Sequence, residues 1–134
     1  MRKLPKITKK PSPYVDEMWR QYMETALWSS NDESDESGGE PMDRNYGVDD
    51  IDEDTQGAML EDCENFYAFN FKDLKAWPAD AAGHEFWLNR NGHGAGFWDS
   101  RHGDDESRNR LSKAAKVYGS VDLYVGDDGK IHSN

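Results

Sequence analysis

This chain of 134 residues contains a single cysteine, Cys63. A single cysteine excludes an intramolecular disulfide and a zinc site built from several thiolates. It is typical of a protein from a reducing compartment. Because Cys63 shares the apolar face of a predicted helix with Met59 and Phe66, we expect a buried small side chain rather than a nucleophile.

Long apolar runs are also absent. No segment approaches the roughly 20 apolar residues that a membrane-spanning helix needs. The basic residues at the N-terminus are not followed by the apolar stretch of a signal peptide. We therefore expect a cytoplasmic protein that makes no membrane contact.

Basic residues are few, with 16 Lys and Arg against 27 Asp and Glu, and the net charge is −11. Direct binding to nucleic acid is disfavoured, because attraction to phosphate dominates that association. Anionic membranes are disfavoured for the same reason. The charge favours a basic protein surface as the partner.

The composition fits one folded domain. We predict a basic flexible arm over residues 1–12, rich in Lys, Arg and Pro, and a single domain over residues 13–134. Within that domain an acidic flexible loop is expected at about residues 30–47, because its Ser, Gly and Asp/Glu content offers nothing to bury.

Apolar periodicity predicts three helices, over residues 14–29, 53–69 and 104–117. Ser12 suits the N-cap of the first helix and Asp52 that of the second. The predicted core residues are Trp19, Met23, Leu27, Leu60, Phe66, Leu111, Leu123 and Val125.

Two hairpins are predicted in the C-terminal half. Aromatic-rich residues 84–90 and residues 97–99 flank Asn91-Gly92, a strong turn signal. Residues 120–125 alternate apolar and polar side chains, and Asp128-Gly129 leads into a short strand at 130–132. The predicted fold class is α+β, with a small antiparallel sheet of about four strands packed against about three helices.

Carboxylates gather at the start of the second predicted helix, which makes this region a candidate protein-binding surface. These acidic residues are Asp49, Asp50, Asp52, Glu53 and Asp54. The alternative is a solvated loop followed by the acidic face of a helix.

The segment 84–102 is the second candidate site, because it combines titratable side chains with glycines that allow a ligand to approach the backbone. Its candidate ligand-binding residues are His84, Arg90, Asn91, His93 and Asp99. The alternative is a tight structural hairpin. The histidine spacing matches no familiar zinc pattern, and no nucleophile or phosphate-binding motif accompanies it, so we assign no catalytic residue, metal or cofactor.

The motif GHEFWLNRNGHGAGFWD at residues 83–99 resembles one found in a family of small acidic proteins encoded by phages and prophages. ALWSS, GEPMDRNYGVDDID, LEDCENF and VDLYVGDDGKI extend the resemblance over about residues 14–132. It implies a phage origin and a role in the cytoplasm of an infected bacterium, and it implies no reaction.

Together these observations predict an accessory protein of phage type that binds a host or phage protein through its acidic surface. Imitation of DNA charge is one way in which such a surface inhibits a partner. Two alternatives stay open: a small enzyme or metal-binding domain built on residues 84–102, and a structural or regulatory partner without inhibitory role. Nothing in the sequence fixes the oligomeric state.

Overall fold

The structure, a computed structural model, describes residues 11–33 and 39–134. Residues 1–10 of the predicted arm and residues 34–38 of the predicted acidic loop lie outside the described residues. The α-helices are α1 (Pro13–Ser29), α2 (Glu53–Asn70), α3 (Ala79–Arg90) and α4 (Asp105–Lys116). The short 3-10 helices are η1 (Met42–Arg44), η2 (Val48–Asp50), η3 (Asp73–Ala76) and η4 (Phe97–Asp99). The strands are β1 (Asn31–Asp32), β2 (Glu40–Pro41), β3 (Leu123–Val125) and β4 (Ile131–Ser133).

Helix α1 begins as its sequence predicts. The Ser12 side chain accepts a hydrogen bond from the backbone N–H of Val15, and Pro13 occupies the first helical position. Proline is tolerated there because no intrahelical partner exists for its missing N–H. The predicted apolar stripe is buried, including Met23 and Leu27, whereas Trp19 is only half-buried.

Helix α2 also follows its prediction. Asp52 caps it by accepting a hydrogen bond from the N–H of Asp54, and acidic residues in the first turn suit the positive end of the helix dipole. Cys63 and Phe66 are fully buried on its inner face. Burial raises the pKa of the Cys63 thiol well above its usual value, which agrees with a packing role.

Helix α3 replaces the strand predicted for residues 84–90, so that prediction is wrong. The helix starts directly after Pro78 and is buried on nearly every side. The run Phe86-Trp87-Leu88 is buried all round the helix and hides the spacing that would have revealed it, and the aromatic residues then mimic a strand. Gly83 faces α1 so closely that an added Cβ would overlap the carbonyl oxygen of Met18.

The second strand of that hairpin, at residues 97–99, is likewise wrong, because Phe97–Asp99 form η4. The buried Asn89 side chain satisfies this segment: its Oδ1 accepts from the Phe97 N–H at 3.1 Å, and its Nδ2 donates to the Ser112 carbonyl at 3.2 Å. Gly96 has φ +150, and a Cβ there would overlap Asn89. A side-chain amide therefore supplies the partners that a neighbouring strand would otherwise supply.

The C-terminal elements agree better with expectation. Asp104 caps α4 by accepting from the Ser107 N–H at 2.7 Å, and Leu111 is buried. Strands β3 and β4 pair antiparallel, with Val125 opposite Ile131. Leu123 is buried and Val125 is half-buried. The hairpin is tied to the start of α2 by a bridge between Ile51 and Ile131.

Within the described part of the acidic segment, β1 and β2 form a second antiparallel pair. Met42, in η1, is almost fully buried against the core. The α+β class thus holds in coarse terms. In the described residues, two small two-stranded sheets stand in place of a sheet of about four strands.

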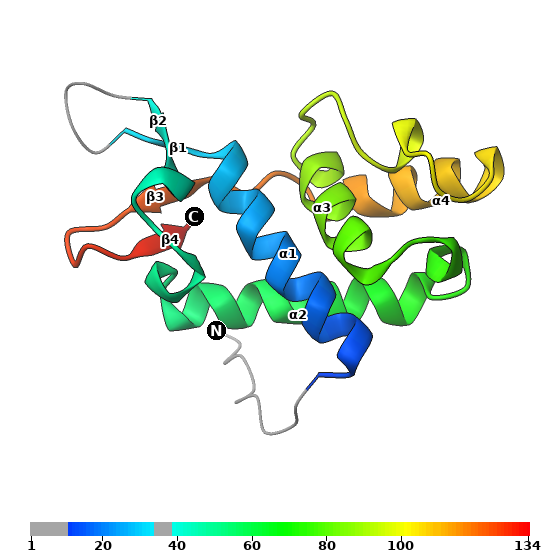
Figure 1. Ribbon diagram of the computed structural model, residues 1–134, viewed down its shortest axis with the longest axis horizontal. Coiled ribbons are helices and arrows are strands. Elements are labelled where there is room, and N and C mark those ends of the chain that lie inside the picture. The colour runs from blue at the N-terminus through cyan, green and yellow to red at the C-terminus, as the bar shows by residue number, and fades with distance from the viewer. Residues whose placement is uncertain (1–10, 34–38) are drawn as a thin grey trace.

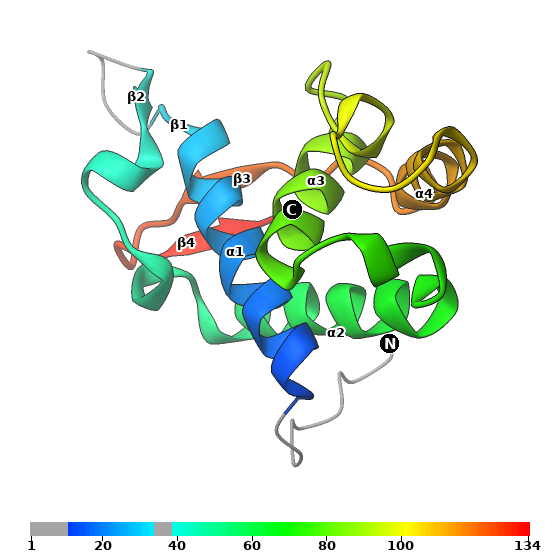
Figure 2. The same ribbon diagram turned by 45° about the vertical axis from the view of Figure 1, so that its right-hand side comes forward.

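The helices are arranged around one core. Helix α1 crosses α2 and runs beside α3, and α4 lies beyond α3 on the side away from the β3–β4 hairpin (Figures 1 and 2). Phe66 of α2 stacks on Phe86 of α3 with ring centroids 4.1 Å apart. No helix in the described ranges combines the length and apolar character that crossing a membrane would require.

Candidate functional site

Arg90, a predicted ligand residue, is engaged inside the protein. Its side chain is 5% exposed and donates to the Asp62 carboxylate at 2.7 Å. It also donates to the Tyr22 hydroxyl and to the carbonyls of Tyr118 and Gly119, each at 2.8–2.9 Å. Because its donors are directed at protein acceptors, Arg90 holds the fold together and does not face a ligand.

Asn91 and His93 lie apart from the other predicted site residues. The Asn91 side chain donates to the Trp87 carbonyl at 2.9 Å and accepts from the Val121 N–H at 2.8 Å. His93 is exposed at the loop tip. Both border a separate depression beside Ser120, away from His84 and Asp99.

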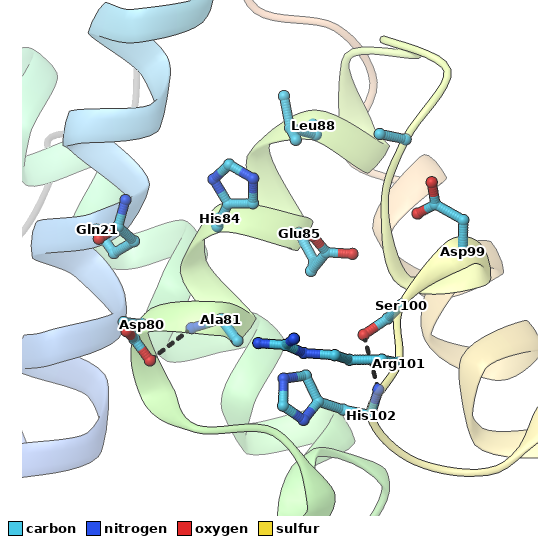
Figure 3. Close-up of a pocket in the computed structure, with 11 residues that line it drawn as sticks. Gln21, Asp80, Ala81, His84, Glu85, Leu88, Asp99, Ser100, Arg101 and His102 are labelled. Atoms are coloured by element: carbon cyan, nitrogen blue, oxygen red, sulfur yellow. Dashed lines mark hydrogen bonds between the residues drawn. The ribbon is translucent and has the colours of Figure 1, made fainter.

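His84 and Asp99 do come together. They line a cavity of about 580 Å³ between α1, α3 and residues 95–102 (Figure 3). We call it the Glu85 cavity; its lining residues are Gln21, Asp80, Ala81, His84, Glu85, Leu88, Ala95, Asp99, Ser100, Arg101 and His102. Its size is that of a small-molecule site.

Glu85 is the most perturbed group in this cavity. Its Oε2 is buried and has no hydrogen-bond partner among the described residues. Burial, and secondarily the charge of Asp99, raise the pKa of Glu85 to about 7. Near neutral pH the side chain therefore exchanges its proton readily, which is the property expected of an acid–base or ligand-binding group.

The other charged groups of the cavity differ in how they are held. Asp80 accepts from the Ala81 N–H at 2.9 Å, and Asp99 accepts from the Gly96 N–H at 3.1 Å. The Arg101 side chain extends from the 100–102 segment towards α3 (Figure 3). It takes part in no ion pair with any residue that the structure describes.

His84 occupies the boundary of a second depression. Its Nδ1 lies 2.9 Å from the Thr25 hydroxyl, and its ring lies 5.9 Å from that of Trp28. Burial lowers the pKa of His84, so the ring is neutral at pH 7. His84 and Gln21 line both depressions, which therefore adjoin.

This second depression, the acidic–aromatic groove, has a volume of about 560 Å³. It is lined by Gln21, Glu24, Thr25, Leu27, Trp28, Asp43, Tyr46, Gly47, Val48, Asp49 and His84. The carboxylates Glu24, Asp43 and Asp49 share it with the ring of Tyr46 and with Trp28, which is 56% exposed. Asp49 and His84 were the groove residues predicted as parts of a site.

The predicted acidic surface continues outwards from this groove. Asp49 and Asp50 lie in η2, and Glu53 and Asp54 lie in the first turn of α2; all four are exposed. Asp52 is half-buried because it caps α2. These five carboxylates, which we call the acidic edge, thus lie in consecutive elements, and Asp49 is the member that lines the groove.

Within the described residues, one group of three side chains has the proximity a metal site needs, namely Asp52, Asp128 and His132. His132 Nε2 lies 3.0 Å from both carboxylate oxygens of Asp128, and its Nδ1 lies 3.8 Å from Asp52. Two carboxylates on opposite ring nitrogens describe a hydrogen-bonded imidazole, because one metal ion binds only one of these nitrogens. The His132 hydrogen bond lowers the pKa of Asp128.

Comparison with known proteins adds no further constraint. The chain matches no protein-family model, no curated protein and no solved structure. The features that bear on function are the two adjoining depressions and the charge around them.

Proposed function

We propose that this protein is a binding module that docks on a basic surface of another protein through the acidic–aromatic groove. The observation that carries the proposal is the exposed indole of Trp28 beside the carboxylates of Glu24, Asp43 and Asp49. An arginine or lysine side chain is attracted both by carboxylates and by the face of an aromatic ring. A large exposed tryptophan is also a frequent anchor of protein interfaces.

The charge around the groove supports this choice of partner. Among the residues that the structure describes, no Lys or Arg lines the groove. The exposed acids at residues 49–54 add negative charge beside it, and the whole chain carries −11. Such a field attracts a basic surface before contact and raises the rate of association.

We further propose that the partner is a bacterial or phage protein, on the strength of the motif at residues 83–99. A basic face that normally holds nucleic acid would fit the groove and its acidic edge, and occupation of that face would inhibit the partner. Competition between this protein and DNA for such a partner would support the inhibitory role. A partner that binds both at once would indicate a regulatory or structural role instead.

A defined basic peptide tests the groove directly. In a titration of ¹⁵N-labelled protein with a lysine- and arginine-rich peptide, we expect the largest shifts at the Trp28 indole and at Tyr46. Trp28→Ala and the pair Asp43→Asn with Asp49→Asn should weaken binding.

Matched controls lie elsewhere on the surface. Trp98 is 54% exposed and lies outside the groove, so Trp98→Ala should leave binding unchanged. Asp127→Asn removes an exposed charge of the same kind that does not line the groove. Equal losses in the groove variants and in these controls would show that the peptide senses net charge alone and would contradict the proposal.

A further inference from the structure

We propose that the Glu85 cavity binds a small organic cation, an alkylammonium or alkylguanidinium ion, between the carboxylates of Glu85 and Asp99. This site adjoins the groove used by the proposed function and shares Gln21 and His84 with it. It uses different carboxylates, and either proposal can fail without the other.

Glu85 has unmet hydrogen-bonding capacity. Its Oε2 is buried and has no partner in the described residues. A buried carboxylate oxygen without a partner is destabilising and calls for an explanation, of which a ligand is one. The Glu85 side chain lines the cavity, so a rotation of its carboxylate would turn this covered oxygen towards a donor that enters.

The charge of the cavity is mainly negative. Helix α3 contributes Asp80 and Glu85, and η4 contributes Asp99; Arg101 is the one Arg or Lys among the described residues that line the cavity. Asp99 already disfavours ionisation of Glu85. A cation placed between these two carboxylates would relieve their repulsion, whereas an anion would increase it.

The shape and lining of the cavity also favour an organic cation. Ala81, Leu88 and Ala95 provide apolar surface next to the carboxylates, and the cavity holds about 580 Å³. Alkyl carbons attached to the charged head would bury against that surface. In the described part of the chain Glu85 belongs to no group of three side chains close enough to hold a metal ion, so an organic cation fits better than a metal.

Binding of the cation should release a proton. The pKa of Glu85 is about 7, so about half of the molecules carry the proton at neutral pH. Only the ionised carboxylate attracts the cation. The ionised fraction rises about tenfold between pH 6 and pH 8, and the affinity should rise by about the same factor.

Other charged groups face Glu85 and enter the test. Asp80 and His84 lie on the same helix, Arg101 and His102 approach from the segment after η4, and α1 contributes the uncharged Gln21. Because the rise in affinity with pH is assigned to Glu85, the variant His102→Asn should retain it.

The experiment is a titration of the full chain with n-butylammonium and n-butylguanidinium at pH 6 and pH 8, followed by ¹H–¹⁵N NMR. We expect shifts at residues 84–88 and 96–102. Calorimetry in buffers of different ionisation enthalpy should register about half a proton released at pH 7. The proposal would be overturned if the backbone amide signals of the cavity residues did not shift with either cation at pH 8.

Variants define the site. Glu85→Gln should weaken binding at pH 8 by about tenfold and abolish its pH dependence. Asp99→Asn should weaken binding as well, and Arg101→Gln should strengthen it, because it removes the competing positive charge. Equal affinities in the original protein and in Glu85→Gln would overturn the proposal. If Glu85→Gln fails to fold, the other two variants still test the proposal, because Asp99→Asn should weaken cation binding and Arg101→Gln should strengthen it.

Two cross-checks separate this site from the groove. Trp28→Ala should bind butylammonium normally, and Glu85→Gln should bind the basic peptide normally. Loss of butylammonium binding in Trp28→Ala would place the cation in the groove and overturn the assignment to the Glu85 cavity.

Discussion

Arg90 connects three regions of the chain from one buried side chain. It reaches Tyr22 of α1, Asp62 of α2 and the backbone after α4. Its guanidinium also lies 5.5 Å from the centre of the Tyr118 ring. A planar group with several fixed donors is suited to such a junction in a way that a lysine is not.

Replacement of Arg90 should therefore be costly. Arg90→Met keeps much of the volume but leaves Tyr22 and Asp62 without their partner, and we expect a loss of about 2–4 kcal/mol in the free energy of unfolding. Urea denaturation measures this loss. Arg110 is the control: it pairs with Asp73 but its side chain is 57% exposed. Arg110→Met should cost less than about 1 kcal/mol, and similar costs at the two sites would contradict the assigned role of Arg90.

Glu85 should make the stability of the protein depend on pH. Its pKa in the folded state, about 7, lies above its ordinary value of 4.5. The folded state therefore holds more protons than the unfolded state between these values, and stability should fall as the pH rises through this window.

Glu85→Gln should remove that dependence. We expect the variant to be more stable than the original protein at pH 8, by roughly 1–2 kcal/mol after allowance for solvent screening of a half-buried side chain. At pH 4 the two proteins should be nearly equal, because both side chains are then neutral. Thermal unfolding at the two pH values provides the measurement. A variant that is less stable at pH 8 would mean that the ionised carboxylate is stabilised in the fold.

Single residues with a local task were predictable from the sequence. Ser12 and Asp52 cap helices as predicted, because their side chains accept hydrogen bonds from N–H groups two or three positions ahead. The task of Arg90 was not predictable, because its partners lie 28 to 68 positions away in sequence. Side-chain chemistry shows that a residue is able to bind something, but only the fold determines what it meets.

At the scale of elements, helix α3 determines how closely α1 packs against it. Its glycine, Gly83, lets α1 approach so closely that the backbones of the two helices touch at Met18. The side of α3 that faces away from α1 carries Glu85 and Leu88 into the cavity. The close packing of one face thus sets the position of the other.

Gly83→Ala should disturb this packing. An added methyl group has no space at Met18, and we expect a loss of about 1–3 kcal/mol or more, measured by urea denaturation. Gly57, inside α2, is the matched control, because an added Cβ there meets nothing within 4 Å. Gly57→Ala should stabilise the protein by about 0.5–1 kcal/mol. A neutral effect at Gly83 would show that the helices separate easily.

Elements with a regular apolar stripe were predictable, and the element whose stripe is hidden was not. Helices α1, α2 and α4 and the β3–β4 hairpin match their predicted positions within a few residues. In α3 the consecutive buried residues Phe86, Trp87 and Leu88 obscure the helical period. The turn signal at Asn91-Gly92 ends this helix instead of reversing a strand. Tertiary packing overrides local preference in such a segment.

At the scale of the whole molecule, the acidic edge and the groove act as one electrostatic surface. Exposed charges are screened within about 10 Å at 0.1 M salt. Association with the basic peptide should therefore slow steeply as salt is added, and stopped-flow kinetics would measure the rates.

Neutralisation of the acidic edge should act on the same rate. The variant with amides in place of Asp49, Asp50, Asp52, Glu53 and Asp54 should associate more slowly, with a smaller change in its dissociation rate. The control for net charge is the double variant Asp122→Asn with Asp127→Asn. It removes as many charges as the double variant Asp49→Asn with Asp50→Asn, with which it is compared. An association rate that changes neither with salt nor with the Asp49 and Asp50 substitutions would exclude electrostatic docking.

The candidate sites were only partly predictable at this scale. Asp49 belongs to the groove, and His84 and Asp99 belong to the Glu85 cavity, as parts of predicted sites. Glu24, Trp28 and Asp43 were missed, because they meet only when η1 and η2 fold back on α1. The one available signal was Trp28, a tryptophan that falls outside the apolar stripe of its helix and therefore had to face either solvent or a partner.

The pairing of α1 with α3 has a consequence for synthesis on the ribosome. Helix α1 packs most extensively against α3, which begins only after α2 and η3 have been made. During translation the part of the apolar stripe of α1 that α3 covers therefore stays exposed until Arg90 has left the exit tunnel. Folding that depends on contacts so distant in sequence is slow to begin, and the unfinished chain is a natural client for a chaperone during this interval.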